Sequence, residues 1–257
     1  MYLKENLAKL NKNFNPKGLK FIEEGSIVKI IESKPYLFNE FNSLKRLLKN
    51  NFGLKFTGPP KFWHFDSAGI EKLNARKLKM EPSKTINELK TQFSGFLDEI
   101  KEVSLKDSMK AFFSNADWFF HAPASLGLHH AYEGGLLEHT VQTTRLALVV
   151  LGNLDEGTII NKDLIIAGAI LHDVGKMNCY QIDGDNIEGT KTYYIQNHIV
   201  NGIKLVSKNI DSEQLDKIIH IIASHHNLKE WGSPIEPKFD EAWIIHFIEN
   251  LSSKLMG

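Results

Sequence analysis

From residue 86 to the end of the chain, apolar residues recur with the spacing of α-helices. Residues 86–113 carry apolar side chains three or four positions apart, at Leu89, Phe93, Phe96, Leu97, Ile100 and Val103. This spacing forms one face of an amphipathic helix. The same pattern predicts helices at 86–113, 135–151, 162–172, 197–209, 211–226 and 240–255. The fold is therefore expected to be mainly α, with an all-α bundle over the C-terminal two-thirds.

The first 82 residues have a different pattern, which predicts a small mixed α/β segment. Residues 25–31 and 54–65 combine β-branched or aromatic residues with Gly and Pro, as extended stretches do, whereas 41–51 is amphipathic at helical spacing. Pro82 marks a boundary, because Ser83 or Thr85 can cap the helix that follows. We therefore predict a mixed segment at 1–82 and a helical domain at 83–257.

The sequence lacks the signals of a membrane or secreted protein. Its longest apolar runs, Leu146–Leu151 and Leu164–Leu171, are far shorter than the roughly 18 residues of a transmembrane helix. The N-terminal residues contain no apolar core of a secretion signal. A single cysteine, Cys179, cannot form an internal disulfide. We expect a cytoplasmic protein with no membrane association and no disulfide partner.

Charge and histidine are unevenly distributed along a chain whose net charge is zero. Residues 1–110 carry 21 Lys and Arg against 13 Asp and Glu, and the remainder carries 10 against 18. Ten of the 11 histidines lie between His121 and His246. An acidic half rich in histidine is typical of a metal-binding domain. The basic half either attracts a polyanion or is simply a solvated lysine surface.

The most informative polar residues lie at the ends of apolar helices. His172 and Asp173 follow the apolar run 163–171, and Gly175 is expected to let the chain turn there. Burying two such groups without a partner would cost several kcal/mol, which favours a bound metal ion. The other candidate ligands on the predicted helices are His139, His198, His225, His226 and Glu249.

Four segments carry a resemblance to a known family. They are HHAYEGGLLEHT (129–140), AGAILHDVGK (167–176), NHIVNGIKLV (197–206) and SHHNLKEWGSP (224–234). In this order and spacing they resemble the HD-domain metal-dependent phosphohydrolases, and most closely the YhaM-type 3'-5' exoribonucleases. The resemblance covers about residues 118–255 and implies an HD-domain helical bundle.

The resemblance also implies roles for individual residues. Asp173 would bridge two ions, one completed by His139, His172 and Glu249, the other by His198, His225 and His226. The ions would be divalent transition metals (Mn, Fe, Co or Ni, with Mg as an alternative). Asp173 and Lys176 are the candidate catalytic residues, Lys176 because it could offset charge on a phosphate.

Two residues are candidates for substrate binding, each with a second interpretation. His130, beside His129, either contacts substrate or orients a ligand. Trp231, in the loop after the histidine pair, either stacks on a base or packs in the interior. Packing is the favoured interpretation for Trp231.

The chain departs from the family pattern at two places. The C-terminal motif usually carries aspartates where Glu249 and Ser252 stand here. YhaM-type proteins usually carry an OB-fold module before the HD domain. Residues 1–80 do not show the five alternating strands of that fold.

The resulting hypothesis is a phosphohydrolase that cleaves phosphodiester bonds in a nucleotide or nucleic-acid substrate, as a 3'-5' exonuclease on RNA or single-stranded DNA. A cyclic-dinucleotide phosphodiesterase is an alternative enzyme, although the histidine pair is not followed by Gly-Tyr-Pro. A nucleotide phosphatase is another. The non-enzyme alternative is a metal-binding regulatory module. The oligomeric state stays open.

Overall fold

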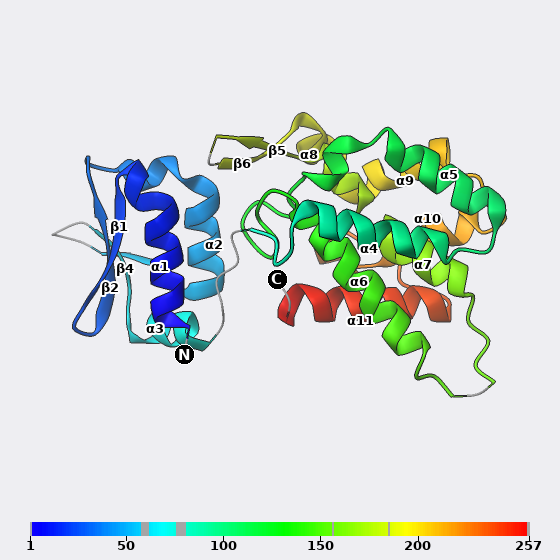
Figure 1. Ribbon diagram of the computed structural model, residues 1–257, viewed down its shortest axis with the longest axis horizontal. Helices are drawn as coiled ribbons and strands as arrows, with labels where there is room; N and C mark the ends of the chain where they lie inside the picture. Colours follow the sequence, from blue (N-terminus) through cyan, green and yellow to red (C-terminus); the bar gives the residue numbers. More distant parts are fainter. Residues whose placement is uncertain (1, 58–61, 76–80, 156, 185, 256–257) are drawn as a thin grey trace.

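The computed structural model describes residues 2–57, 62–75, 81–155, 157–184 and 186–255. Its N-terminal part is an antiparallel sheet of four strands in the order β1-β2-β4-β3. The strands are β1 (Leu19–Glu24), β2 (Ile27–Glu32), β3 (Lys55–Thr57) and β4 (Phe62–Phe65). Helices α1 (Leu3–Phe14), α2 (Asn42–Phe52) and α3 (Ser67–Ala75) accompany them. In Figure 1 the sheet lies at the outer edge of the molecule, with α1 and α2 between it and the helical bundle.

The prediction of a small mixed α/β segment is confirmed. The extended stretch 25–31 contains β2, the stretch 54–65 contains β3 and β4, and 41–51 lies almost entirely in α2. Helices α1 and α3 and strand β1 were not predicted from the sequence. The apolar side chains of these elements, such as Leu10, Phe21 and Phe65, form a hydrophobic core of their own. Three helices accompanying four described strands are not the five-stranded barrel of an OB-fold.

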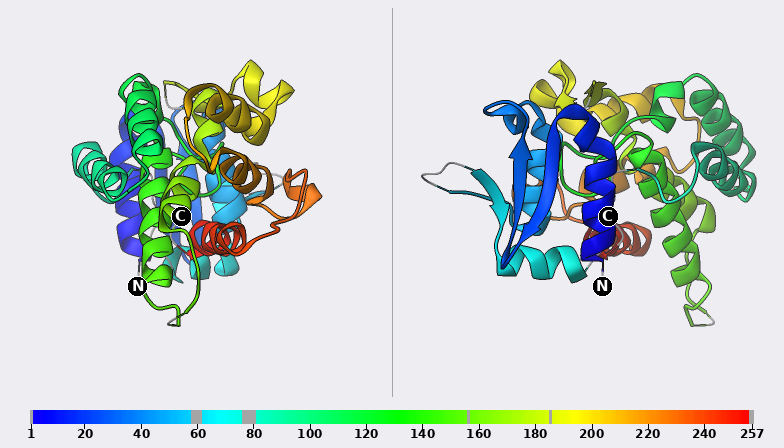
Figure 2. Two further views of the ribbon diagram at one scale, coloured as in Figure 1. Left: turned by 90° about the vertical axis from the view of Figure 1, so that its right-hand side faces the viewer. Right: turned by 60° about the vertical axis from the view of Figure 1, so that its left-hand side comes forward.

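The rest of the chain is the predicted helical bundle. Its helices are α4 (Ile86–Asp98), α5 (Val103–Ser114), α6 (Gly135–Leu151), α7 (Lys162–Leu171), α8 (Lys191–Ile195), α9 (Asn197–Asn209), α10 (Leu215–Ser224) and α11 (Asp240–Leu255). Helix α7 lies at its centre, with every residue from Leu164 to Leu171 buried. Helix α6 packs against α7 and α11, as Figure 2 also shows. This second core includes no residue of the first, and the proposed division at residues 82 and 83 lies between them.

The single helix predicted at 86–113 is in fact two helices. The backbone N–H groups of Lys101 and Glu102 donate to the carboxylate of Asp163, which caps the start of α5 from another part of the chain. Val103, expected on the apolar face, is 70% exposed. A contact between residues about 60 positions apart thus separates α4 from α5. The spacing of apolar residues within 86–113 does not predict this contact.

The predicted helix boundaries are otherwise close. Thr85 caps α4 and forms a capping box with Glu88. Ser83 does not cap the helix; its backbone N–H and its hydroxyl donate hydrogen bonds to Oε1 of Glu138. Asn161 caps α7 as expected. Helix α10 begins at Leu215, later than predicted, because the Ser212 hydroxyl accepts from the backbone ahead of the helix.

An antiparallel hairpin interrupts the bundle, so the prediction of an all-α region is wrong there. It consists of β5 (Tyr180–Asp183) and β6 (Asn186–Gly189), and it lies against α2. Ile187 and Cys179 are buried in a small cluster beneath it. Two strands of four residues are too short to give a clear alternating pattern. In the described part of the chain, no helix has the length and apolar character needed to cross a membrane.

Candidate metal centre

Five helices bring the predicted ligands together at their ends or inner faces. His139 lies on α6, His198 on α9 and Glu249 on α11. The pairs His172-Asp173 and His225-His226 directly follow α7 and α10. Their ligand atoms form two groups, each with all atoms within 4.8 Å of one another. The groups are His139, His172, Asp173 and Glu249, and Asp173, His198, His225 and His226.

Asp173 is the residue common to both groups, and each of its oxygens faces a different one. Oδ2 lies 3.4 Å from Nε2 of His139 and 3.5 Å from Nε2 of His172. Oδ1 lies 3.6 Å from Nε2 of His198 and 3.6 Å from Nε2 of His225. The carboxylate is fully buried. This is the arrangement expected of a ligand shared by two ions.

Glu249 reaches the first group despite replacing a shorter aspartate. Its Oε2 lies 2.8 Å from Nε2 of His139 and 3.6 Å from Nε2 of His172. The additional methylene therefore does not keep the carboxylate out of the centre.

Two histidines are held with a fixed ring nitrogen facing the centre. Nδ1 of His172 lies 2.9 Å from the carbonyl oxygen of Ala169, and Nδ1 of His225 lies 2.8 Å from that of Ile222. A carbonyl only accepts, so each Nδ1 carries a proton, and in the neutral ring that could bind a metal the lone pair is on Nε2, which faces the centre. Nδ1 of His246 donates to the carbonyl of His225 at 2.8 Å, which supports this ligand from behind.

The donor set fits divalent metal ions. Both Asp173 oxygens, Nε2 of His225 and Oε2 of Glu249 are buried atoms that make no well-formed hydrogen bond to a described residue. Buried polar atoms of this kind are costly unless something binds them. Imidazole and carboxylate are ligands suited to transition metals such as Mn, Fe, Co and Ni.

The pKa shifts agree with two anionic carboxylates and a neutral His198. Burial alone would raise the pKa of both carboxyl groups, but Lys176 and His172 hold the pKa of Asp173 well below its ordinary value, and His139 does the same for Glu249. Burial lowers the pKa of His198 to about 3, so this ring is neutral. In His172 burial is outweighed by Asp173 and Glu249, which raise its pKa to about 10. The same carboxylates that attract a proton there would attract a metal cation.

Lys176 and Gly175 follow the shared carboxylate. The Lys176 ammonium lies 2.6 Å from Oδ2 of Asp173 and is buried, so its positive charge is held directly beside the shared carboxylate. From the sequence we expected Gly175 to allow a turn that requires a positive φ. That prediction is wrong, because the φ of Gly175 is not positive. Gly175 is needed for close packing: a Cβ there would lie 1.9 Å from the carbonyl oxygen of His198 and 2.5 Å from the backbone nitrogen of Gly202. Only glycine lets α9 approach closely enough to bring His198 to Asp173.

A cavity of about 330 Å³ opens beside this centre, lined by His129, His225, His226, Trp231 and Glu249 among others. Trp231 is 52% exposed, so the interpretation that it packs in the interior is wrong. His130 is only 1% exposed and lies behind the cavity wall, where Nε2 contacts Gln142. His129 lines the cavity instead. Burial, and then the charge of Lys176, lower the pKa of His129 to about 3.

Sequence reasoning missed the contribution of the N-terminal part to this cavity. Asn51, at the end of α2, lines it and donates a hydrogen bond of 3.2 Å to the carbonyl of Leu128. Lys254 of α11 lines it too. No local pattern could reveal Asn51, because its position depends on how α2 packs against the bundle.

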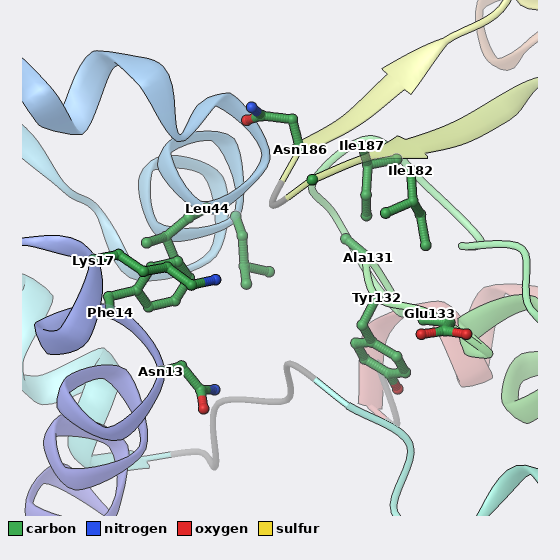
Figure 3. Close-up of a pocket in the computed structure, with 12 residues that line it drawn as sticks. Asn13, Phe14, Lys17, Leu44, Ala131, Tyr132, Glu133, Ile182, Asn186 and Ile187 are labelled. Carbon is green, nitrogen blue, oxygen red and sulfur yellow. The ribbon is translucent and has the colours of Figure 1, made fainter.

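A second cavity between the two parts of the molecule, of about 310 Å³, contains none of the predicted site residues. Figure 3 shows Phe14 and Lys17 on one side of it and Tyr132 and Glu133 on the other. It lies apart from the ligand groups.

Comparison with known proteins agrees with this geometry. Residues 136–254, which include all seven candidate ligands, match the family model described as HD domain. This part of the chain is an HD domain. The HD domain accounts for the helices α6 to α11 and for both ligand groups.

Curated relatives of this HD domain include phosphodiesterases and exoribonucleases. A dihydroneopterin 2',3'-cyclic phosphate phosphodiesterase of Methanocaldococcus jannaschii is 38% identical over 136 residues, which is 52% of each chain. The 3'-5' exoribonuclease YhaM of Listeria innocua is 31% identical over 179 residues, or 66% of this chain and 55% of the relative. The YhaM of Bacillus licheniformis is 34% identical over 146 residues, or 53% and 44%. The chain thus spans about half the length of the curated relatives that it matches. No solved structure gives a significant match.

The ligand role of Glu249 can be tested by two substitutions. Glu249→Gln removes the charge and leaves a weakly binding amide beside His139, so we expect the affinity of the first group for Mn²⁺ to fall about 10- to 100-fold. Glu249→Asp restores the residue usual in the family and should keep both ions. Titration of the metal-free protein with Mn²⁺ measures both affinities, and unchanged binding by Glu249→Gln would mean that this carboxylate is not a ligand.

Proposed function

We propose that this HD-domain phosphohydrolase cleaves phosphodiester bonds by using two divalent metal ions. The observation that carries the proposal is Asp173, whose two oxygens each face a separate group of ligands. Two ions held together supply Lewis acidity and an activated water for in-line displacement at phosphorus. Two relatives, an exoribonuclease and a cyclic phosphate phosphodiesterase, are named for the cleavage of phosphodiester bonds.

The residues of the chain would orient the substrate around this centre. Asp173 and Glu249 supply fixed negative charge, and the buried Lys176 offsets part of it where an anionic phosphate must approach. Trp231 and Lys254 lie in the cavity wall, where an aromatic face and a cation could hold a base and a phosphate.

Within phosphodiesters, we propose a ribonucleotide substrate such as the 3' end of single-stranded RNA. A neighbouring cavity, lined by Arg46, Tyr193 and Tyr194, shares Leu128 with the metal cavity. Arg46 and Tyr194 are exposed. A guanidinium beside tyrosines is the combination by which proteins follow a single strand. A cyclic phosphodiester is the second candidate, favoured by the Methanocaldococcus jannaschii relative.

The reaction type is tested with the Mn²⁺-loaded protein and two chromogenic esters. We expect turnover of bis-p-nitrophenyl phosphate, its loss after chelation, and its return when Mn²⁺ is added. His172→Ala should abolish it, because the buried ring is a ligand of the first group. Turnover of p-nitrophenyl phosphate alone would indicate a nucleotide phosphatase. Bound metal without turnover of either ester would favour a regulatory module.

The same preparation separates the substrate candidates when it is offered an oligoribonucleotide, a 2',3'-cyclic nucleotide and a cyclic dinucleotide. For a strand-binding enzyme we expect Arg46→Ala to slow oligoribonucleotide cleavage about fivefold, with a reduced salt dependence, and to leave the chromogenic diester unaffected. Preference for either cyclic substrate would contradict the assignment to RNA ends.

A further inference from the structure

Helix α11 exposes one stripe of side chains along its outer face. Among its described side chains, the exposed ones are Asp240, Trp243, Phe247, Leu251 and Lys254. Residues three or four positions apart share a face of a helix, so these five form a continuous line. The inner face of α11 packs against α6, α7 and α10. Figures 1 and 2 show the helix at the surface of the bundle, where the stripe is open to solvent.

The centre of the stripe is apolar and aromatic. Phe247 is 62% exposed, Leu251 46% and Trp243 36%. The rings of Trp243 and Phe247 stack, with centroids 5.7 Å apart and planes inclined by 24°. Single exposed apolar residues are normal on protein surfaces, whereas large ones gathered in one patch mark an interaction surface. The outer face of α11 therefore has the character of an interface.

The stripe has the same spacing when it is followed in either direction from Phe247. Trp243 and Leu251 lie four residues to either side, and Asp240 and Lys254 lie seven. Two antiparallel copies of α11 that cross at Phe247 would therefore bring each Asp240 to Lys254 of the other copy, and each Trp243 to Leu251. A two-fold interface must be complementary to itself in this way. Spacings of three and four residues are also those by which paired helices pack.

We propose that the outer face of α11 is a homodimer interface, in which two copies of this chain pair antiparallel about Phe247. Charge complementarity selects a second copy as the partner. Asp240 and Lys254 are exposed, and neither forms an ion pair with a described residue. The antiparallel pairing matches both charges and the apolar centre at once. An anionic membrane surface would also cover the apolar centre, but it would repel Asp240.

The size of the stripe sets the expected strength of the dimer. The 14 residue steps from Asp240 to Lys254 span about 21 Å of helix. One helix pair of this length buries less than the roughly 1,600 Å² of a standard interface, so we expect a reversible dimer with a Kd on the order of 10 µM. Lys254 also lines the metal cavity. An ammonium group has three donors, so its pairing with Asp240 leaves a donor for a phosphate.

The helix dipole is a second explanation for the two charges. An acidic residue in the first turn and a lysine in the last turn of α11 each stabilise an isolated helix. Exchanging the two charges distinguishes the explanations. The exchange is unfavourable for the dipole of each helix, but it restores both ion pairs of an antiparallel dimer.

Sedimentation equilibrium of the full chain between 1 and 200 µM tests the interface. We expect a monomer–dimer equilibrium in the wild type. Phe247→Glu places two carboxylates at the two-fold axis and should raise the Kd at least tenfold, without loss of folding because the side chain is mostly exposed. Val103→Glu is the matched control: Val103 is an exposed apolar residue of α5 and 70% exposed, so this variant should dimerise as the wild type does. A wild type that stays monomeric at 200 µM, or an unchanged Kd in Phe247→Glu, would overturn the inference.

Charge reversal tests the antiparallel register. Asp240→Lys and Lys254→Asp should each raise the Kd about fivefold, because each sets two like charges against each other in both pairs. The double variant should return to within twofold of the wild type. Failure of the double variant to recover would mean that the two residues do not meet, and would contradict the proposed pairing.

Crosslinking with a short bismaleimide provides an independent measurement of the register. Cys179 is buried, so the wild type should not react, whereas Phe247→Cys should form a crosslinked dimer with itself. Identical residues at 243 or at 251 would lie about 12 Å apart along the helix axis. A mixture of Trp243→Cys and Leu251→Cys should therefore crosslink more than either variant alone. Equal yields from the mixture and the separate variants would rule out the antiparallel arrangement.

Discussion

Replacing Asp173 by alanine should remove both metal ions at once. No other residue belongs to both ligand groups, so its loss takes one oxygen from each and leaves the histidines without the charge between them. We expect the metal content of Asp173→Ala to fall below a tenth of that of wild type, and diester turnover to fall by 10³-fold or more. Metal analysis after gel filtration and a rate measurement in Mn²⁺ check both values.

Two further variants make this expectation specific to the shared position. His198→Ala removes a ligand of the second group alone, so about one ion per chain should remain. Asp183→Ala removes an exposed carboxylate from the hairpin and should behave as wild type. If Asp173→Ala kept both ions, the shared carboxylate would not be a ligand, and the two-metal proposal would fail with it.

Much of the metal centre could be predicted from the sequence because its ligands lie on long helices. The predicted bounds of 135–151, 197–209 and 240–255 are those of α6, α9 and α11. Helix α9 has apolar residues on one face, whereas α6 is buried on all sides from Gly135 to Thr144, and both patterns reflect packing in the core. Once the resemblance had assigned the ligands, helix geometry left little freedom in where they point. Among the described residues, two of the three possible metal-holding groups are those that the resemblance implied, and the third, of His129, His130 and His139, was not predicted.

What the sequence did not reveal depends on contacts between distant residues. The break between α4 and α5 comes from Asp163, some 60 residues further along the chain. Asn51 enters the cavity wall only because α2 packs against the bundle. Glu138 and Gln142 are polar residues inside a helix and give no local sign that they orient His130. Such residues become visible only when the tertiary structure places them together.

Gly175 is a residue whose importance lies in the absence of a side chain, and Gly175→Ala should be strongly destabilising. The new Cβ would lie 1.9 Å from a backbone oxygen and 2.5 Å from a backbone nitrogen of α9, and backbone atoms cannot move aside as a flexible side chain can. Overpacking usually costs 1–3 kcal/mol, so with both neighbours in the backbone we expect the free energy of unfolding to fall by about 3 kcal/mol. Urea denaturation of the metal-free protein measures this change.

The same substitution should weaken one metal site selectively. To accommodate the methyl group, α9 must move away from Gly175 and carry His198 away from Asp173, whereas His139 and His172 lie on other helices. We therefore expect the second group to lose at least tenfold in Mn²⁺ affinity while the first binds nearly as wild type. Gly95→Ala is the matched control, since a Cβ in α4 would meet nothing within 4 Å and alanine favours a helix by up to about 1 kcal/mol. Equal stability of Gly175→Ala and Gly95→Ala would show that α9 tolerates the displacement, and that the close approach at Gly175 does not determine the position of His198.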